Sequence, residues 1–144
     1  MAVLGTKSES IFVERIFSNS TTWTPSFSCR AYVTVIGPGG SGGSARNTSD
    51  NRAAAASGGG AGGCAKSLLI LSSSVTYTIT IGTGGASVSG AAGNAGGASS
   101  EFTGSDITDM EAVEGSGGIQ AATGGNTAQA GGAGGAASGG NIWN

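Results

Sequence analysis

The chain has 144 residues, of which 30 are glycine, and its formal net charge is −2. Valine, isoleucine, leucine and phenylalanine together make 24 of the residues, which is below the roughly 20% at which a packed hydrophobic core becomes doubtful. A disordered chain would normally combine such low hydrophobicity with a high net charge. The composition therefore indicates a single domain that something other than a large core holds together.

Charge is distributed unevenly along the chain. All six basic residues lie at or before Lys66, and five of the eight acidic residues lie between Glu101 and Glu114. The basic residues do not form the clustered face that a nucleic-acid groove requires, so no nucleic-acid partner is expected. No segment approaches the ~20 apolar residues of a membrane span and the start has no signal-peptide pattern, so neither membrane insertion nor secretion by the usual route is expected.

Three runs of residues predict β-strands. Residues 31–36 (AYVTVI) are β-branched and aromatic and stop at a Gly-Pro-Gly-Gly sequence. Residues 66–71 (KSLLIL) suit a strand that is covered on both faces, although a buried helical turn has the same length. Residues 75–81 (VTYTITI) alternate between apolar and threonine positions, which predicts one buried face. The serines at 72–74 have a hairpin's length, so we expect the second and third strands to pair antiparallel.

The first 30 residues differ from the rest. Residues 11–17 (IFVERIF) predict an amphipathic strand or a short helix, and residues 18–30 predict a connection or an edge segment, because Pro25 favours an extended residue before it. We therefore divide the chain into an N-terminal attachment segment, residues 1–30, and a glycine-rich domain, residues 31–144.

Glycine recurs with a period of three. Eleven X-Gly-Gly triplets hold 22 of the 30 glycines. Three residues per turn is the period of the polyproline II helix, which has no internal hydrogen bonds, so its backbone groups need partners on neighbouring segments when they are buried. The predicted fold is mainly β, with short antiparallel strands that brace a bundle or sandwich of polyglycine II helices and with little or no α-helix. A flexible Gly/Ser linker is the alternative.

Two glycine motifs resemble catalytic ones. Residues 37–42 match G-x-G-x-x-G after a strand, but no amphipathic helix follows, so a dinucleotide loop is not expected. Residues 39–43 match G-x-S-x-G, but the chain has no histidine to act as the base of a triad. The sequence predicts that the protein is not an enzyme and that it needs no cofactor.

The cysteines and the acidic residues have structural interpretations. Pairing of residues 31–36 with residues 66–71 would place Cys64 near Ile36 and Cys29 near Leu71, too far apart for a disulfide, and the two thiols also lack metal-site spacing. The acidic residues between positions 101 and 114 do not follow the EF-hand spacing, so they predict a solvated loop and no metal site.

The order of these motifs resembles the glycine-rich domain of bacteriophage tail fibres and other virion proteins. The resemblance spans residues 18–140 and rests on TWTP, AYVTVIG before PGGSGG, GGGAGG before CAKSLLIL, VTYTITIGTGG, and GGASSEF. It implies a sandwich of glycine helices braced by β-strands, in a structural protein that builds or tips a fibre and can touch the host surface. The chain stops just after NIWN, where related sequences tend to continue, so we expect no separate distal receptor-binding domain in it.

Partners and location follow from this resemblance. It implies a virion protein, assembled in the host cytoplasm, whose partners are other virion proteins. A homo-oligomer is expected, with a trimer as the first guess, because a small core favours shared burial. One alternative is a receptor-binding adhesin that reads a bacterial surface receptor through residues 44–57 and 101–114. Another is a flat polyglycine ice-binding protein, against which the irregular triplets argue.

Six residues are candidates for contacts with a receptor or a subunit. They are Trp23, Trp143, Arg46, Arg52, Asp106 and Asp109. In a chain with few large apolar residues, tryptophans more often anchor packing or a subunit interface than contact a glycan or receptor, so that role is the expected one for Trp23 and Trp143.

Overall fold

The computed structural model describes residues 13–45, 54–121 and 128–142, which form seven β-strands. The strands are β1 (Thr21–Trp23), β2 (Cys29–Ile36), β3 (Cys64–Leu71), β4 (Tyr77–Thr80), β5 (Ser100–Thr103), β6 (Met110–Ala112) and β7 (Ala137–Ser138). These residues contain no helix, and so none that is long and apolar enough to cross a membrane. The expectation of a mainly β, antiparallel protein is confirmed.

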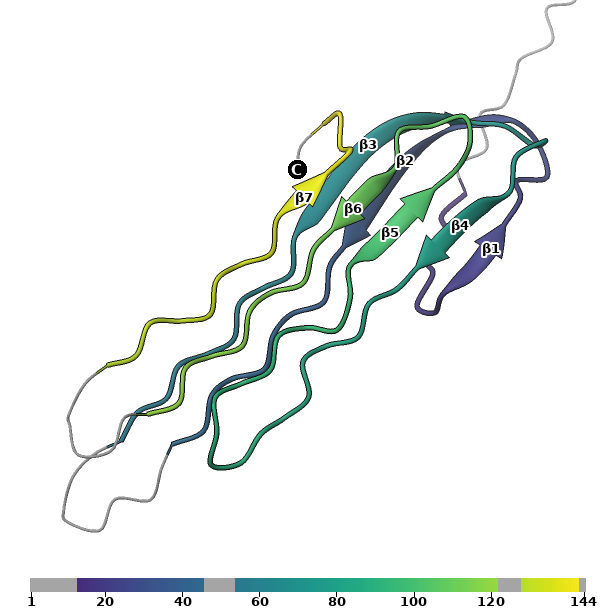
Figure 1. The fold of residues 1–144 in the computed structure, drawn as a ribbon. Coiled ribbons are helices and arrows are strands. Elements are labelled where there is room, and N and C mark those ends of the chain that lie inside the picture. The colour runs from purple at the N-terminus through teal and green to yellow at the C-terminus, as the bar shows by residue number, and fades with distance from the viewer. Residues whose placement is uncertain (1–12, 46–53, 122–127, 143–144) are drawn as a thin grey trace, which may run out of the picture.

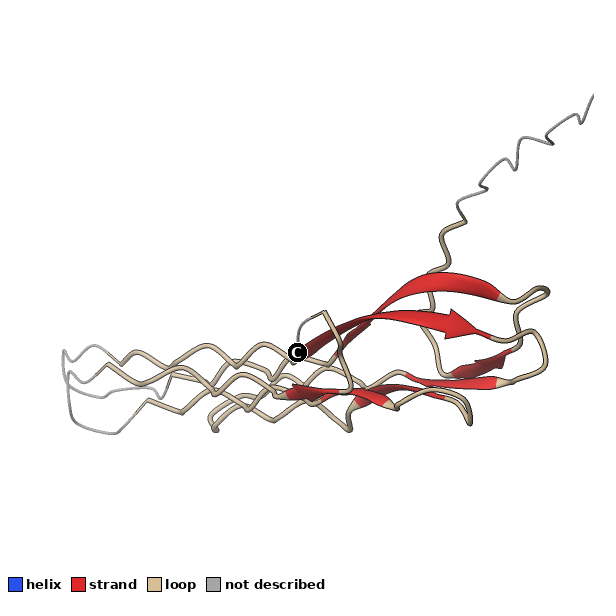
Figure 2. Cartoon of the chain, turned by 90° about the horizontal axis from the view of Figure 1, so that it is seen from above, coloured by secondary structure: helices blue, strands red, loops and turns tan. Residues whose placement is uncertain are grey.

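The strands form two antiparallel sheets. Five of them pair in the order β1-β4-β5-β6-β7, and β2 pairs with β3 alone. Strand β2 contacts β5 and β6, and β3 contacts β6 and β7, so the smaller sheet covers one face of the larger one. The two sheets occupy one end of the molecule, and the glycine-rich chain leads away from them toward the other end (Figures 1 and 2).

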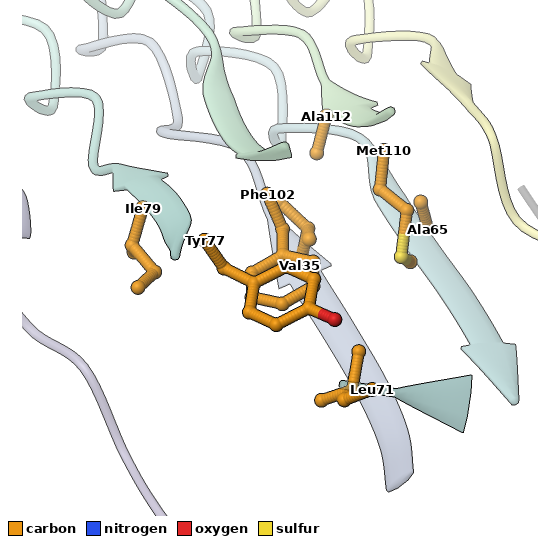
Figure 3. Close-up of a cluster of buried hydrophobic side chains, with 8 residues drawn as sticks. All are labelled: Val35, Ala65, Leu71, Tyr77, Ile79, Phe102, Met110 and Ala112. Atoms are coloured by element: carbon orange, nitrogen blue, oxygen red, sulfur yellow. The ribbon is translucent and has the colours of Figure 1, made fainter. Parts of the chain in front are cut away.

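The core lies between the two sheets and is small (Figure 3). Tyr77 stacks on Phe102 with ring centroids 5.2 Å apart. Leu71 from β3 and Met110 from β6 are also almost completely buried. Both sheets thus contribute to the core, and β2 and β3 reach it because the alternate residues of each strand point toward β5 and β6.

Six glycine-rich segments extend the strands. We call them g1 (residues 37–45), g2 (54–63), g3 (82–86), g4 (91–98), g5 (113–121) and g6 (128–136). Segment g1 follows β2 and g2 precedes β3; g3 and g4 connect to β4 and β5 in the same way, and g5 and g6 to β6 and β7. The chain therefore makes three long excursions, each of which leaves one strand and returns to another (Figure 1).

The three strands predicted from sequence are present. Strand β2 contains residues 31–36, β3 contains residues 66–71, and β4 lies within residues 75–81, with Tyr77 and Ile79 buried and Thr78 exposed. Strand β1 lies in the segment predicted to be a connection or an edge, and it is an edge strand. The predicted register of the cysteine-bearing strands is also confirmed, because Cys29 pairs with Leu71 and Ile36 with Cys64, and both thiols are free.

The predicted hairpin between residues 66–71 and 75–81 is wrong. Strand β3 pairs with β2, whereas β4 pairs with β1 and β5 in the other sheet. The serines at 72–74 form a turn, but this turn carries the chain between the sheets. It is held there by Ser28, whose Oγ accepts a hydrogen bond from the Ser73 N–H at 3.1 Å.

Two other local predictions are also wrong. Residues 101–114 are not a solvated loop, because β5 and β6 form a hairpin in which Glu101 lies directly opposite Glu111. Residues 13–17, the described part of the predicted amphipathic segment, are neither strand nor helix. Phe17 and Arg15 pack on Trp23 instead, with the Phe17 ring centroid 6.0 Å from that of Trp23, so packing rather than backbone pairing fixes this segment.

Candidate functional site

The register of the strands continues into the glycine segments. Beyond the pair of Ile36 with Cys64, the N–H of Gly37 donates to the carbonyl of Gly63 at 2.8 Å, and the N–H of Gly40 donates to the carbonyl of Gly60 at 2.9 Å. Bonds between g1 and g2 thus recur every three residues, whereas a β-ladder repeats every two. The strands therefore set the alignment of the segments that they anchor.

The period of three sends successive backbone groups to different neighbours. Within g1, the N–H of Gly40 donates to g2, and the N–H of the next residue, Ser41, donates to the carbonyl of Asn94 in g4 at 2.9 Å. The carbonyl of Ser41 accepts from the N–H of Gly118 in g5 at 2.9 Å. One segment is therefore bonded on several sides at once, which a flat β-ladder does not allow.

The six segments form two rows of three, g3–g1–g2 and g4–g5–g6. Two staggered rows of three have nine neighbouring pairs, and backbone hydrogen bonds join all nine. Within the rows, the bonded pairs are g3–g1, g1–g2, g4–g5 and g5–g6; between the rows, they are g3–g4, g1–g4, g1–g5, g2–g5 and g2–g6. Figure 2 shows these two layers of chain from the side, continuous with the strands. We call this arrangement the glycine lattice.

Glycine is required where the segments approach each other most closely. A β-carbon on Gly40 would lie 2.1 Å from the carbonyl oxygen of Ser116, and one on Gly60 would lie 1.9 Å from that of Ala133. No side chain fits at such distances, so these positions need a residue without one. Burial shows the same period, since Ser57, Gly60 and Gly63 are buried while Gly58 is exposed.

Serine side chains complete the bonding where the backbone alone does not. The Oγ of Ser57 accepts from the N–H of Ile119 at 2.7 Å, and the Oγ of Ser41 accepts from the N–H of Asn94 at 2.9 Å. At the junction with the strands, the Oγ of Ser100 accepts from the N–H of Gly82 at 3.1 Å. Each of these hydroxyls satisfies an N–H group that would otherwise lack a partner in the lattice.

Trp23, one of the predicted contact residues, is half-buried. Its ring centroid lies 6.3 Å from that of Tyr77 and 5.5 Å from the Arg15 guanidinium carbon. It therefore links the N-terminal segment to the core, which is the packing role expected from the sequence. Trp143, Arg46 and Arg52 lie outside the described residues.

Asp106 and Asp109 hold the connection between β5 and β6. An Asp106 carboxylate oxygen accepts from the Tyr77 hydroxyl at 3.0 Å, and Asp109 accepts from the N–H of Gly104 at 3.4 Å. Both carboxylates are exposed. Asp106 contacts the core through the Tyr77 hydroxyl, and Trp23 packs on the ring of the same tyrosine. Asp109 instead lies on the side of the hairpin that carries Glu101 and Glu111. The three candidate residues therefore do not converge on one pocket.

A shallow depression of about 210 Å³ lies on the outer face of the larger sheet. Glu101, Asp109 and Glu111 contribute to its lining, together with Thr103, Met110 and Ser138. Within the described ranges, no group of three or more histidine, cysteine, aspartate or glutamate residues is arranged to hold a metal ion.

The glycine lattice is the largest organised feature of the described chain, and its presence could be inferred from sequence only in outline. The three-residue period pointed to lateral bonding, but no local pattern identifies which segments become neighbours. The position of each segment along the chain is the informative signal, because each segment begins or ends at a strand, and the pairing of that strand determines which segments become neighbours.

A family model described as a glycine-rich domain matches residues 16–144. No curated protein and no solved structure matches the chain.

Proposed function

The chain belongs to the glycine-rich domain family, and from this premise we propose that it is a structural protein of a bacteriophage virion, a component of a tail fibre or a similar surface appendage. The glycine lattice is the observation that carries the proposal. Lateral hydrogen bonds join all nine neighbouring pairs of segments, so the body has the stiffness that a projecting element needs without a large core. The assignment to a phage particle rests on the resemblance of the motifs.

We further propose that the glycine segments are polyglycine II helices. The three-residue recurrence of the bonds and of the buried positions supports this conformation, which turns once in three residues. Over the nine residues of g1 it gives a body about 28 Å long. Amide hydrogen exchange tests the idea, because the N–H groups of Gly115, Gly118 and Gly132 donate within the lattice and should exchange slowly. Random-coil exchange at these positions would rule it out.

Contact with the host belongs to the same proposal. Residues 44 and 45 at the end of g1, and 54–57 at the start of g2, lie at the end of the body that is remote from the strands (Figure 1). A projecting fibre would present this end outward. Replacing residues 46–53, between g1 and g2, with a short Gly/Ser connection keeps the lattice-bonded Ser44 and Ser57. The replacement should abolish adsorption to the host if the chain is itself the adhesin, and should leave infectivity intact if the chain only supports another protein.

Virion membership can be tested directly. An antibody against this chain should decorate a tail appendage when purified particles of the phage that carries the gene are viewed by electron microscopy. Mass spectrometry of the same particles should detect peptides of the chain at a constant ratio to the major tail protein. Absence of the chain from purified, infective particles would refute the proposal.

A further inference from the structure

Some glycines of the lattice have no steric reason to be glycine within one chain. A β-carbon on Gly58 would meet nothing within 4 Å, and those on Gly42 and Gly84 would have their nearest neighbours at 3.5 and 3.9 Å. Gly39 has its nearest neighbour at 3.4 Å. Glycine loses more conformational freedom on folding than any other residue, so these positions weaken the monomer without relieving a contact in it.

These positions share one side of the lattice. Gly84 belongs to g3, Gly39 and Gly42 to g1, and Gly58 to g2, and these three segments form one row, in which g1 and g2 continue from the smaller sheet and g3 follows β4. In the opposite row, g4 and g6 place alanine at exposed positions such as Ala95, Ala133 and Ala136. Open glycines also occur in g6, where β-carbons on Gly131 and Gly134 would have their nearest neighbours at 3.8 and 3.7 Å, and g2 exposes Ala55 and Ala61. The open glycines of g1 and g2 are set apart because these two segments continue from β2 and β3.

Segment g1 also has unused hydrogen-bonding groups. Among the described residues, the N–H groups of Gly39 and Gly42 donate no hydrogen bond, and the carbonyls of Gly37 and Gly40 accept none. They recur at three-residue intervals, as do the groups that join g1 to g2 and to g5. A further glycine layer placed here would continue the bonding that already joins the two rows of this chain.

The adjoining outer face of the smaller sheet carries three exposed large apolar residues alongside Arg30, Thr34 and Lys66. Tyr32, Ile36 and Ile70 are 65%, 67% and 74% exposed, and all three point away from the larger sheet. Strands β2 and β3 thus leave large apolar side chains in water, on the face opposite the one that packs on the core. Since g1 follows β2 and g2 precedes β3, this face of the sheet and the outward face of g1 and g2 form one continuous surface.

We propose that this surface, the g1–g2 face, is the interface with a second copy of the same chain, in which glycine lies against glycine and strand against strand. The pairing is isologous, so the same patch is used by both copies. The two segments and their strands are about 50 Å long and together about 10 Å wide. Two copies would remove on the order of 1,000 Å² from water, which reaches the lower limit for a specific interface.

The charges on the g1–g2 face are few enough to allow a second copy to bind there. Arg30 and Lys66 place like charges at the strand end of the face in both copies. The Lys66 ammonium lies 5.8 Å from the ring of its own Tyr32, so it is directed along its own sheet. Salt screens the remaining repulsion, so self-association should strengthen as the salt concentration rises.

The test is self-association of the full chain, measured by sedimentation and light scattering over a range of concentrations. The wild type should form a particle of twice the 13.6 kDa chain mass. Gly42→Glu should raise the dissociation constant at least roughly tenfold, because it places two like charges in a closed interface. The matched control is Ala133→Glu, at an exposed site on the opposite row, which should leave the constant unchanged.

A second variant and an exchange measurement test the same interface independently. Gly58→Glu should act like Gly42→Glu, and it provides a second variant if the first does not fold, since nothing lies within 4 Å of its β-carbon. The Gly39 N–H should exchange with solvent more slowly at dimer concentrations than in the Gly42→Glu variant. A wild type that stays monomeric, a particle of three chains, or equal effects of the glycine variants and Ala133→Glu would overturn the proposal. These outcomes do not depend on whether the chain is part of a virion.

Discussion

A β-carbon on Gly135 would lie 2.1 Å from the carbonyl oxygen of Val113, because g6 packs directly against g5 at this point. The N–H of Gly135 donates at 2.8 Å to the carbonyl of Ala61 on the other side. Its neighbour Gly134 has nothing closer than 3.7 Å. Adjacent glycines of one segment therefore meet opposite steric demands, and the lattice requires only one of them to lack a side chain.

Gly135→Ala should destabilise the protein by about 1–3 kcal/mol or more, because backbone must move to admit the methyl group. Gly134→Ala should be neutral or should stabilise by about 0.4–1 kcal/mol, since alanine restricts the unfolded chain and meets no obstacle in the folded one. Urea denaturation of the two variants measures the difference. Equal loss of stability in both would show that the segments are not packed as described.

Tyr77→Phe tests a large polar side chain of the core. The Tyr77 hydroxyl accepts from the N–H of Ser72 at 2.8 Å and donates to Asp106 at 3.0 Å, while the ring is fully buried. Its removal leaves the Ser72 N–H without its partner, so a loss of about 1–3 kcal/mol in the free energy of unfolding is expected. Tyr32→Phe is the control, because Tyr32 is 65% exposed and should change stability little.

The same tyrosine predicts a dependence on alkaline pH. Burial raises the pKa of Tyr77 above its ordinary value of 10.0, and the hydrogen bond to Asp106 raises it further, although the Ser72 N–H opposes this. Because the folded state favours the neutral phenol, its contribution to stability is complete below pH 10 and is lost as the pH rises through the higher pKa of the folded state. The stability gap between the wild type and Tyr77→Phe should therefore narrow above pH 10. A gap that stays constant from pH 8 to 12 would contradict this.

Sequence reasoning predicted the elements that carry their own signal. Residues 31–36 and 75–81 are rich in β-branched and aromatic residues, so β2 and β4 were expected from local pattern. Strands β5 to β7 are only two to four residues long, and their sequences SEFT, MEA and AS have little strand preference. These short strands form because the neighbouring strands and the glycine lattice hold their backbone in position, and no local sequence pattern indicates this.

Strand pairing was less accessible to prediction for the same reason. The serines at 72–74 have the composition of a hairpin turn, yet the pairing of β3 is fixed by g1 and g2, whose bonds extend the β2–β3 register. The residues of a turn determine the backbone over about four positions, whereas the pairing of β2 with β3 brings together residues as far apart as Ile36 and Cys64. Of the candidate contact residues, Trp23, Asp106 and Asp109 proved to have intramolecular partners, which composition alone could not show.

Ser67→Ala should increase stability. Ser67 is 1% exposed on the inner face of β3, and in the described part of the chain its Oγ has no hydrogen-bond partner. Replacing an unpaired buried hydroxyl with a methyl group should stabilise the protein by about 1 kcal/mol. Ser100→Ala provides the contrast, because the equally buried Ser100 Oγ accepts from the Gly82 N–H and its loss should cost about 1 kcal/mol. Thermal unfolding of both variants should therefore shift in opposite directions.

Ala98 marks the place where the second excursion, between β4 and β5, changes register. Between the pair of Thr80 with Glu101 and the bridge of Thr83 with Gly97, the chain advances by three residues on the g3 side and by four on the g4 side. The g4 side therefore contains one extra residue. Ala98 takes up this residue with a φ of 48°, a left-handed conformation that costs an alanine about 1–2 kcal/mol.

Ala98→Gly should therefore stabilise the protein by up to about 1 kcal/mol, because relief of the strain exceeds the extra entropy that a glycine loses on folding. Ala95→Gly is the matched control, since Ala95 is also exposed in g4 and has no positive φ, so it should destabilise by about 0.5–1 kcal/mol. Denaturant midpoints of the two variants should lie on opposite sides of the wild type. If both variants lose stability equally, the bulge at Ala98 stores no strain, and the register change must be accommodated elsewhere in g4.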